Sequence, residues 1–473
     1  MADMHYDLAV VGAGPAGLAA TKVAAAAGLR VVVLDDQMKA GGQIYRQPFA
    51  QDLYPPERFG RSHREAGLRM DGILAQDNVR WLRGTNVVGL QQGRQRGFTL
   101  FCHAGETVSE LAADRVLVAA GCHDMAVPFP GWTVPGVMGA GGIQAMMKGQ
   151  GVVPGRAVVL AGSHPLLLVI AAQLHAFGCT PKAVIFAQSP ARVAAVLRSP
   201  LTAIRNAGVF AEGARAYLAL RRAGVRIVFN KAVLAAMGTE RLERIVVGSV
   251  KGRPEFELEC DSLGLGYGFT ASTELLRQIG VDFSWQRAGG GWVANHGADM
   301  QSNIPGLYVA GEVAGIGGAP TADVEGRLAG LAIVSAAGRP APRGSVARLA
   351  RQRRRRRRFA ELLAEMADPG EALLRAVRSD DTTICRCEGV TVASLRQSLH
   401  DNPHLSTLNA AKLLTRVGMG PCQGRFCQAA VTEEIMSARS GRPAATEPYT
   451  ARFPVRPVPL TAFVQRDGAG GKG

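Results

Sequence analysis

The sequence predicts a multidomain α/β protein in which a second α/β unit is inserted into the first and a small cysteine-containing unit follows. Three observations lead to this prediction: an apolar segment that runs into a glycine-rich turn at the N-terminus, a similar segment near residue 160, and four cysteines close together in the last quarter. A chain of 473 residues is also longer than a single hydrophobic core usually supports. We therefore expect several domains.

The first unit begins with an apolar segment, residues 6–11, of the kind found in parallel strands buried on both faces. It runs into Gly12-Ala13-Gly14-Pro15-Ala16-Gly17, and an alanine-rich helical stretch follows over residues 18–27. A strand, a glycine-rich loop and a helix in this order predict a dinucleotide site. Gly12 would allow the tight turn, Gly14 the approach of a pyrophosphate and Gly17 close packing of helix on strand. The helix N-terminus would then face the phosphates.

A second apolar strand, residues 29–34, ends at Asp35, where a carboxylate can accept hydrogen bonds from the ribose hydroxyls of adenosine. Gly41-Gly42-Gln43 and Ile44-Tyr45-Arg46 follow. A glycine pair shortly after the ribose acid resembles FAD-binding proteins of the glutathione-reductase type. The resemblance implies that Gly42, Gln43 and Arg46 also contribute to the FAD site.

Two later segments agree with this resemblance. Residues 114–121 are similar to the strand that returns to the FAD domain and ends in a small-residue turn, here Ala120-Gly121. Residues 303–312 are similar to the closing motif of the family, in which a carboxylate after a glycine holds the flavin ribityl chain. Gly311 and Glu312 occupy those positions, and the family more often has Asp than Glu.

The second unit has an altered glycine fingerprint. An apolar strand over residues 156–160 leads into Ala161-Gly162-Ser163-His164-Pro165-Leu166-Leu167, where His164 and Leu167 replace two glycines. A histidine there would stand where a pyrophosphate must approach, and the following strand, residues 183–186, is not followed by the expected acid or arginine. We expect a Rossmann-like insertion that is retained for architecture or for another nucleotide, without tight nicotinamide binding.

The eight cysteines fall into two groups. Four are single, which predicts inert core thiols rather than a disulfide scaffold: Cys102, Cys122, Cys179 and Cys260. The others form a C-x-C pair, Cys385 and Cys387, and a C-x4-C pair, Cys422 and Cys427. Two such pairs suit zinc or an iron-sulfur cluster, and this spacing is less usual for zinc.

The segment around the paired cysteines resembles the [2Fe-2S] domain of bacterioferritin-associated ferredoxin and of nitrite reductase large subunits. The resemblance implies that Cys385, Cys387, Cys422 and Cys427 hold a cluster between short helices at residues 391–399 and 406–416. Arg386 and Arg425 lie next to the ligands in sequence. Their positive charge would raise the potential of the cluster.

The net charge of +16 is partly local, because Arg353 to Arg358 are six consecutive arginines. We interpret this run as a solvated basic helix face or linker rather than a nucleic-acid site, and leave open a role in subunit docking or phosphate binding. We expect helix over residues 359–366. No apolar run is long enough to span a membrane, and we expect a cytoplasmic protein, with peripheral membrane association left open.

These features predict six segments. The predicted α/β fold is that of a flavoprotein with two dinucleotide-binding domains, similar to glutathione reductase. Its FAD-binding domain comprises residues 1–132 and 263–337, the Rossmann-like insertion residues 133–262, the Arg-rich linker or helix residues 338–377, the small helical [2Fe-2S] domain residues 378–440, and the Pro-rich tail residues 441–473.

Nearly the whole chain resembles the α or A subunit of heteromeric amino-acid dehydrogenases, which include opine oxidase, D-hydroxyproline dehydrogenase and hydrogen cyanide synthase. The resemblance implies an electron-transferring oxidoreductase subunit. A partner β subunit with its own FAD would oxidise the amine, and an interfacial FMN and a small ferredoxin-like γ subunit are found in some relatives.

Two alternatives stay open. The chain could be a self-contained NAD(P)H-dependent reductase, or a scaffold that binds another adenine nucleotide and has the cluster as its only redox group. No catalytic residue is assigned. His123, just after Gly121, is either a satisfied loop histidine or a residue near a flavin.

Overall fold

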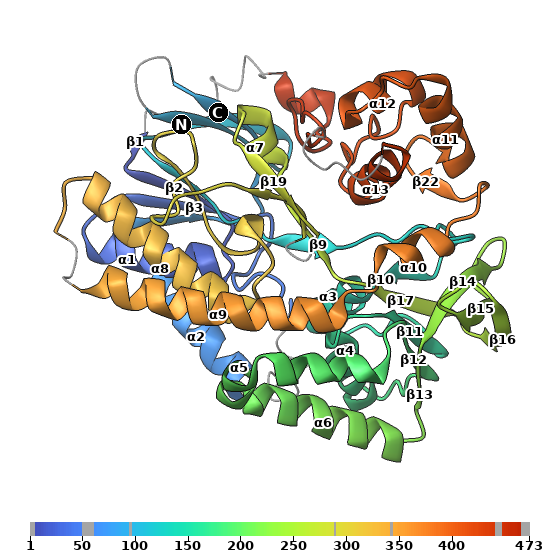
Figure 1. Cartoon of the computed structure of the whole chain (residues 1–473). Coiled ribbons are helices and arrows are strands. Elements are labelled where there is room, and N and C mark those ends of the chain that lie inside the picture. The colour runs from blue at the N-terminus through green and yellow to red at the C-terminus, as the bar shows by residue number, and fades with distance from the viewer. Residues whose placement is uncertain are drawn as a thin grey trace, which may run out of the picture.

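The computed structural model describes residues 5–49, 61–93, 97–287, 290–340, 344–439 and 447–464. Its first region is built on a five-stranded parallel sheet in the order β21-β8-β2-β3-β4 (Figure 1). The strands are β2 (Leu8–Val11), β3 (Val31–Leu34), β4 (Val79–Leu82), β8 (Val116–Val118) and β21 (Leu307–Val309). The helices are α1 (Pro15–Ala26), α2 (Arg61–Leu74), α7 (Glu274–Ile279) and α8 (Ala319–Ala336).

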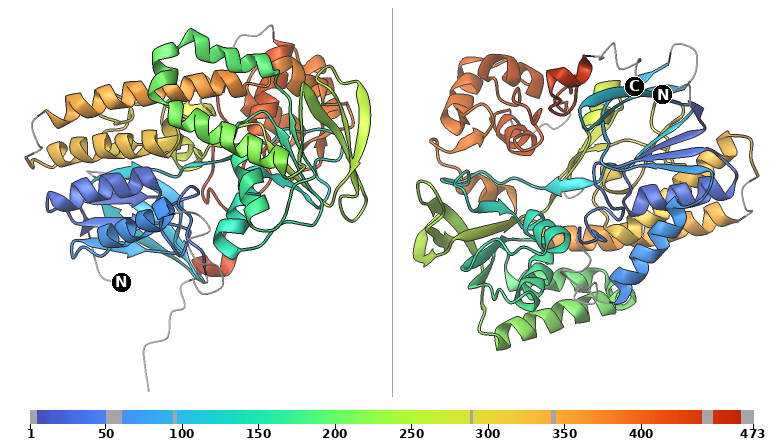
Figure 2. Two further views of the ribbon diagram at one scale, coloured as in Figure 1. Left: turned by 90° about the horizontal axis from the view of Figure 1, so that it is seen from below. Right: turned by 180° about the vertical axis from the view of Figure 1, so that it is seen from behind.

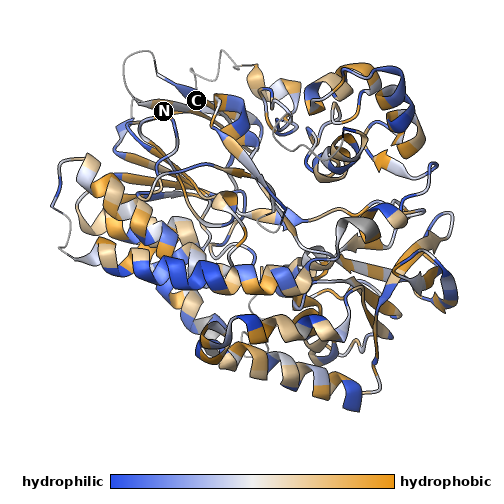
Figure 3. Cartoon of the chain, in the orientation of Figure 1, coloured by the Kyte–Doolittle hydropathy of each residue, from blue (hydrophilic) through white to orange (hydrophobic). Residues whose placement is uncertain are grey.

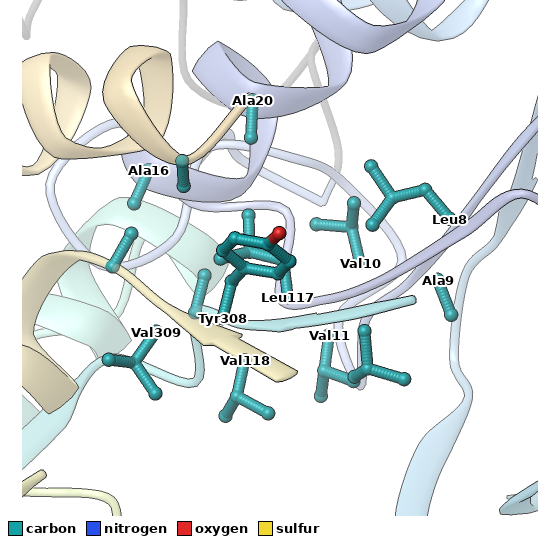
Figure 4. Packing of buried hydrophobic residues seen from close by; sticks show 14 of the residues in the cluster. Leu8, Ala9, Val10, Val11, Ala16, Ala20, Leu117, Val118, Tyr308 and Val309 are labelled. Carbon is teal, nitrogen blue, oxygen red and sulfur yellow. The ribbon is translucent and has the colours of Figure 1, made fainter. Parts of the chain in front are cut away.

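The centre of this sheet is apolar on both faces. Every residue of β2, β3, β8 and β21 is buried, as short runs of Val and Leu between two layers require. Figure 4 shows labelled side chains of β2, β8 and β21 packed below Ala16 and Ala20 of α1. Helix α8 packs on α1 through glycines: a Cβ at Gly326 would lie 2.0 Å from the carbonyl oxygen of Ala16. This packing fixes the start of α1, where the glycine-rich turn lies.

Smaller sheets complete the first region. One has the order β1-β7-β6-β5, and another pairs β19 with β20. Their bounds are β1 (His5–Tyr6), β5 (Asn86–Gln92), β6 (Phe98–Ala104), β7 (Thr107–Ala113), β19 (Phe283–Gln286) and β20 (Gly291–Ala294).

The second region is an inserted α/β unit with a parallel sheet in the order β10-β17-β11-β12-β13 and a three-stranded antiparallel sheet, β14-β15-β16. The strands of the parallel sheet are β10 (Val137–Gly139), β11 (Val158–Gly162), β12 (Ala183–Phe186), β13 (Arg226–Phe229) and β17 (Ser262–Gly266). Those of the other sheet are β14 (Lys231–Met237), β15 (Arg244–Ser249) and β16 (Pro254–Glu259). The helices are α3 (Ala140–Gln150), α4 (Leu166–Ala176), α5 (Pro200–Arg205) and α6 (Ala207–Arg222), with the 3-10 helix η2 (Pro190–Arg198).

Two antiparallel strands connect the regions: β9 (Cys122–Asp124) leads into the insertion and β18 (Phe269–Ala271) leads back, with His123 opposite Thr270. The expected insertion of one α/β unit into another is therefore confirmed.

The C-terminal region is a small, mainly helical unit with a hydrophobic core of its own (Figures 1 and 2). It contains β22 (Thr383–Cys385), β23 (Val390–Thr391), α11 (Val392–Asp401), α12 (Leu408–Thr415) and α13 (Gln428–Ala438), and the 3-10 helix η6 (Leu460–Phe463) follows. Helix α10 (Glu371–Ala376) precedes this unit and packs in the core of the inserted unit through Leu373 and Leu374. Its two expected helices are present as α11 and α12. None of the described helices is long and apolar enough to cross a membrane.

Helix α9 (Ser345–Ala367) carries the arginine run and packs along α8 (Figure 1). It begins at Ser345, well before the helix expected from residue 359. Figure 3 shows the hydrophilic band that the arginines form on α9. The segment is therefore a packed helix rather than a linker over this range.

Candidate nucleotide and iron-sulfur sites

The N-terminal glycine turn is too tight for side chains at two positions. Gly12 has φ 108°, and a Cβ there would lie 2.4 Å from the carbonyl oxygen of Ala119. A Cβ at Gly17 would lie 1.9 Å from the carbonyl oxygen of Gly12. Gly14 is the N-cap of α1 and Pro15 its first residue, and none of the described side chains caps this end. The helix N-terminus thus presents backbone N–H groups and a favourable dipole to an anion.

Asp35 lies directly after β3, beside this turn. Its Oδ2 accepts a hydrogen bond from the Ala13 N–H at 2.5 Å, and its Oδ1 accepts one from the Gln37 N–H at 2.7 Å. Burial raises the pKa of the carboxyl, and the two backbone hydrogen bonds oppose that rise. Each carboxylate oxygen has a further lone pair, so ribose hydroxyls could also donate to this group.

The loop with the glycine pair closes over the same turn. Gly42 has φ 59°, and a Cβ there would lie 3.1 Å from the Cα of Gly14. Arg46 donates from Nη1 to Gln37 Oε1 at 2.8 Å and from Nη2 to Gln43 Oε1 at 3.1 Å. Its buried Nε has no hydrogen-bond partner among the described residues. The residues predicted from the first two sequence segments are therefore brought together.

The two other predicted segments reach the same place. The backbone nitrogen of Ala120 lies 3.5 Å from where a Cβ of Gly12 would be, and Gly121 has φ 74°. A Cβ at Gly311, which has φ 77°, would lie 3.0 Å from the Cβ of Ala16. The ends of β8 and β21 thus meet the glycine turn at the carboxyl edge of the sheet, where ligands bind in open α/β sheets.

Glu312 makes contacts that the sequence did not predict. Its Oε2 accepts from the Gly317 N–H at 3.0 Å and its Oε1 from the Gly318 N–H at 2.8 Å, at the start of α8. Burial raises the pKa of the carboxyl, and these two hydrogen bonds oppose it. The side chain therefore shapes the N-terminus of α8, and a ribityl contact stays a prediction.

A buried ion pair holds the backbone of the closing motif at Gly311. Glu325 in α8 is fully buried; its Oε2 accepts from the Gly311 N–H at 3.2 Å, and its Oε1 accepts from Arg353 Nε at 2.8 Å and Arg357 Nε at 2.9 Å. Arg357 also donates to the carbonyl oxygens of Ala314 and Gly315. Sequence reasoning missed this role. The i,i+4 spacing of Arg353 and Arg357, which puts both on one helix face, was the available signal.

In the inserted unit, His164 fills the place of the second fingerprint glycine. Its ring packs edge-on against Phe269 with centroids 5.2 Å apart, and its Nδ1 accepts from the Leu166 N–H, the first residue of α4. The cavity here, also bounded by Leu167, measures about 10 Å³, roughly the room of one water molecule. Burial lowers the pKa of His164 to about 4, so it is neutral. The histidine thus occupies the helix N-terminus that would receive a pyrophosphate.

The four clustered thiols lie close together: Cys385 interacts with Cys427 and Cys387 with Cys422, and Cys427 also interacts with Cys422 and Cys387. The hydrogen bond from Cys427 is the main cause that lowers the pKa of Cys385 to about 6, and burial raises the pKa of Cys387. A Cβ at Gly420 would lie 2.2 Å from the Cβ of Cys387, so glycine is required beside the ligand loop.

This arrangement bears on the kind of metal centre. Within the described ranges, no group of three or more His, Cys, Asp or Glu side chains is placed to hold a metal ion. Four cysteine thiols gathered in this way could serve as the four ligands of a [2Fe-2S] cluster or of a zinc ion. The other four cysteines are free thiols whose pKa is raised, first by burial. Cys102, Cys179 and Cys260 are buried, whereas Cys122 on β9 is partly exposed.

The loop that carries Cys422 and Cys427 touches the strand that follows Gly121. The His123 Nε2–H on β9 donates to the carbonyl oxygen of Arg425 at 3.0 Å, and Arg425 Nε donates to Glu274 Oε1 at 3.0 Å. Burial lowers the pKa of His123 to about 4, so its ring is neutral.

Burial alone would raise the pKa of Glu274, but Arg425 and Arg277 outweigh it and lower the pKa to about 2. Glu274 is therefore ionised and paired within this contact. The strand that follows Gly121, helix α7 and the loop of Cys422 and Cys427 thus share one polar interface.

Two family models match the chain: pyridine nucleotide-disulphide oxidoreductase over residues 6–330, and BFD-like [2Fe-2S] binding domain over residues 383–437. The opine oxidase A subunit of Rhizobium meliloti (strain 1021) is 32% identical, over 96% of this chain and 97% of its own. Its counterpart in Agrobacterium tumefaciens (strain Ach5) is 34% identical, over 96% and 90%. Hydrogen cyanide synthase subunit HcnB of Pseudomonas protegens is 30% identical, over 98% of each chain.

Among solved structures, L-proline dehydrogenase from P. horikoshii is similar with a TM-score of 0.72 and 20% identity, over 98% of this chain and 80% of that chain. Thioredoxin reductase of T. acidophilum is similar with a TM-score of 0.50 and 17% identity, over 71% and 99%. At these identities, the similarity establishes the fold.

Proposed function

The chain belongs to the pyridine nucleotide-disulphide oxidoreductase family, within the group of opine oxidase A subunits and HcnB, and we propose that it is the electron-transferring subunit of a heteromeric dehydrogenase. The complex would oxidise an amino acid or N-substituted amino acid of the opine, hydroxyproline, proline or glycine type. It would work in the cytoplasm.

One observation carries the electron-transfer role: the loop of Cys422 and Cys427 packs against β9 directly after Gly121, through the His123 to Arg425 hydrogen bond. Electrons must pass between two groups that lie near each other. The strand that follows Gly121, at the edge of the proposed nucleotide site, contacts the cysteine loop directly, which supports this requirement.

The residues around the glycine turn fit FAD. Gly14, Gly42 and the N-terminus of α1 would hold the pyrophosphate, and Asp35 the adenosine ribose. Around this core, the remaining contacts would come from Gly12, Pro15, Ala16, Gly17, Gln43, Arg46, Ala120, Gly121, Gly311 and Glu312. FAD exchanges electrons in pairs or singly, and a [2Fe-2S] cluster exchanges them singly.

Cys385, Cys387, Cys422 and Cys427 would be the cluster ligands. Their thiols lie close together, and Cys385 also accepts a hydrogen bond from the Gly418 N–H at 3.5 Å. An N–H directed at a ligand sulfur would stabilise negative charge on it.

The oxidation of the amine would take place on a partner. The names of the curated relatives describe lettered subunits of an oxidase and a synthase, which supports a multi-subunit assembly. We propose a β subunit with its own FAD, with an interfacial FMN and a small ferredoxin-like γ subunit as further components.

Purification of the native complex, followed by a screen of opines, prolines and glycine with an artificial electron acceptor, tests the assembly. The expected result is a co-purifying flavoprotein and amine oxidation that requires it. Turnover of these amines by the isolated chain, with no partner recovered, would contradict the heteromeric model.

Release of the bound nucleotide by denaturation, together with iron and sulfide assays, tests the two cofactors. FAD with two irons and two sulfides per chain is expected, whereas ATP without flavin would support the scaffold alternative. Rapid flavin reduction by NADH or NADPH would instead support a self-contained reductase, against which the contacts of His164 argue.

A further inference from the structure

Tyr449 belongs to the segment after the C-terminal unit, yet its side chain is buried inside that unit. It is 1% exposed and packs in the same core as Cys385 and Cys427. Sequence patterns suggest no role for this segment, and the BFD-like match ends at residue 437, before Tyr449.

The ring of Tyr449 packs against two glycines of the loop that carries Cys422 and Cys427. A Cβ at Gly418 would lie 2.7 Å from the Cζ of Tyr449, and a Cβ at Gly424 would lie 2.3 Å from its Cδ2. Gly418 donates its N–H to Cys385, and Gly424 lies between Cys422 and Cys427. The loop between α12 and α13, which carries Cys422 and Cys427, is therefore shaped around this aromatic ring.

The backbone of Tyr449 is fixed at both of its polar atoms. Its N–H donates to Gln428 Oε1 at 3.2 Å, and its carbonyl oxygen accepts from Arg277 Nη1 at 2.8 Å. Arg277 also donates to Gln428 Oε1 at 2.9 Å. Because Arg277 comes from α7 of the first region, the position of Tyr449 is set by both regions.

The hydroxyl of Tyr449 is buried and has no hydrogen-bond partner of normal geometry among the described residues. Its surroundings are nevertheless defined: burial raises its pKa, and the neighbouring thiols of Cys427 and Cys385 raise it further. A buried phenol O–H normally finds an acceptor, because leaving it unpaired costs free energy. The sulfur of Cys427 is the acceptor that this position offers.

We infer that Tyr449 completes the cluster site, its phenol O–H donating a hydrogen bond to the sulfur of Cys427 when the cluster is bound. This inference rests on the cluster of the proposed function. Hydrogen bonds to ligand sulfurs raise the reduction potential, because they stabilise the added negative charge of the reduced form. Tyr449, from the C-terminal tail, is thus a positioning residue that raises the reduction potential of the cluster.

The test is the midpoint potential of the cluster in the full-length Tyr449→Phe variant, measured by redox titration with electron paramagnetic resonance detection. The substitution keeps the ring against Gly418 and Gly424 and removes only the hydroxyl. We expect the variant to keep its iron and sulfide. The ratio of reduced to oxidised cluster at a fixed potential should fall about tenfold, equivalent to about 59 mV for one electron.

Tyr267→Phe is the matched control, since Tyr267 is 4% exposed, burial raises its pKa, and it follows β17 in the inserted unit. The control should leave the cluster potential unchanged. Equal potentials in the wild type, Tyr449→Phe and Tyr267→Phe would overturn the inference. A wild-type protein without iron and sulfide would instead overturn the proposed function.

If Tyr449→Phe does not retain its cluster, 3-fluorotyrosine at position 449 alone supplies the decisive measurement. Fluorine makes the phenol a stronger hydrogen-bond donor while the ring stays in place. The potential of the cluster should then rise above that of the wild type, and an unchanged potential would overturn the inference.

Discussion

Replacing Glu325 by glutamine removes a charge that is buried completely and is contacted by two arginines. The amide has the same shape as the carboxylate, so packing is kept. It cannot accept from Arg353, Arg357 and the Gly311 N–H together, because one of its two polar atoms is a donor. At least one of these donors therefore loses its acceptor.

The expected loss of stability depends on how deeply Glu325 and its two arginines are buried. Breaking a buried ion pair by removing one partner costs about 3 to 5 kcal/mol. The side chains of Arg353 and Arg357 are 23% and 19% exposed, so water can compensate them in part. We therefore expect a loss near the lower end, about 3 kcal/mol, which is about a hundredfold in the unfolding equilibrium.

Urea unfolding followed by circular dichroism measures this loss, and Asp323→Asn is the matched control. Asp323 lies in the same helix and pairs with Arg327 at 2.7 Å, but both side chains are well exposed. Such a pair contributes at most about 0.5 kcal/mol. If both variants shifted the urea midpoint of unfolding equally, the claim that the ion pair of Glu325 with Arg353 and Arg357 stabilises the closing motif would be refuted.

Three further predictions follow from the same structure. Cys387→Ser should abolish stoichiometric iron binding while Cys179→Ser retains it, as an iron assay will show; equal iron content would contradict the ligand assignment. In the wild type, His123 takes up its proton near pH 6.5 when unfolded but only near pH 4 when folded, so the free energy of unfolding should fall by about 2 kcal/mol from pH 7 to pH 5 through this residue. His123→Gln should lack this fall. Urea titrations at the two pH values check this, and identical losses would refute it. Gly17→Ala should cost about 3 kcal/mol through overlap with the carbonyl oxygen of Gly12, whereas Gly213→Ala, inside α6 with open space around it, should gain about 0.5 to 1 kcal/mol; melting curves that fail to separate the two would contradict the packing argument.

Features that depend on local sequence could be predicted. The strand over residues 183–186 has its expected bounds, because a short run of buried Val and Ile between turns is specific. The N-terminal glycine turn was also recognised, since each of its glycines has a local steric reason. The altered second fingerprint was predicted for the same reason.

Features that depend on long-range contacts could not be predicted. Glu325 is an ordinary acid in the sequence, and only the packing of α9 on α8 shows that it is buried against two arginines. His123 and Arg425 are 302 residues apart, and no periodicity relates them. Tyr449 lies in a segment that composition describes only as proline-rich. In each case the contact that gives the residue its role is made with a residue from another helix, strand or loop.

The two ion-pair clusters that the sequence did not predict have the same physical arrangement. Each pairs a buried carboxylate with arginine beside a loop that would hold a redox group: Glu325 with Arg353 and Arg357 behind Gly311, and Glu274 with Arg425 beside the cysteine loop. A buried pair loses much of its free energy when one partner moves, because the remaining charge is then left without compensation in a poorly solvated place. The proposed electron transfer would require a fixed separation between its two sites, which a buried ion pair beside each loop would help to maintain.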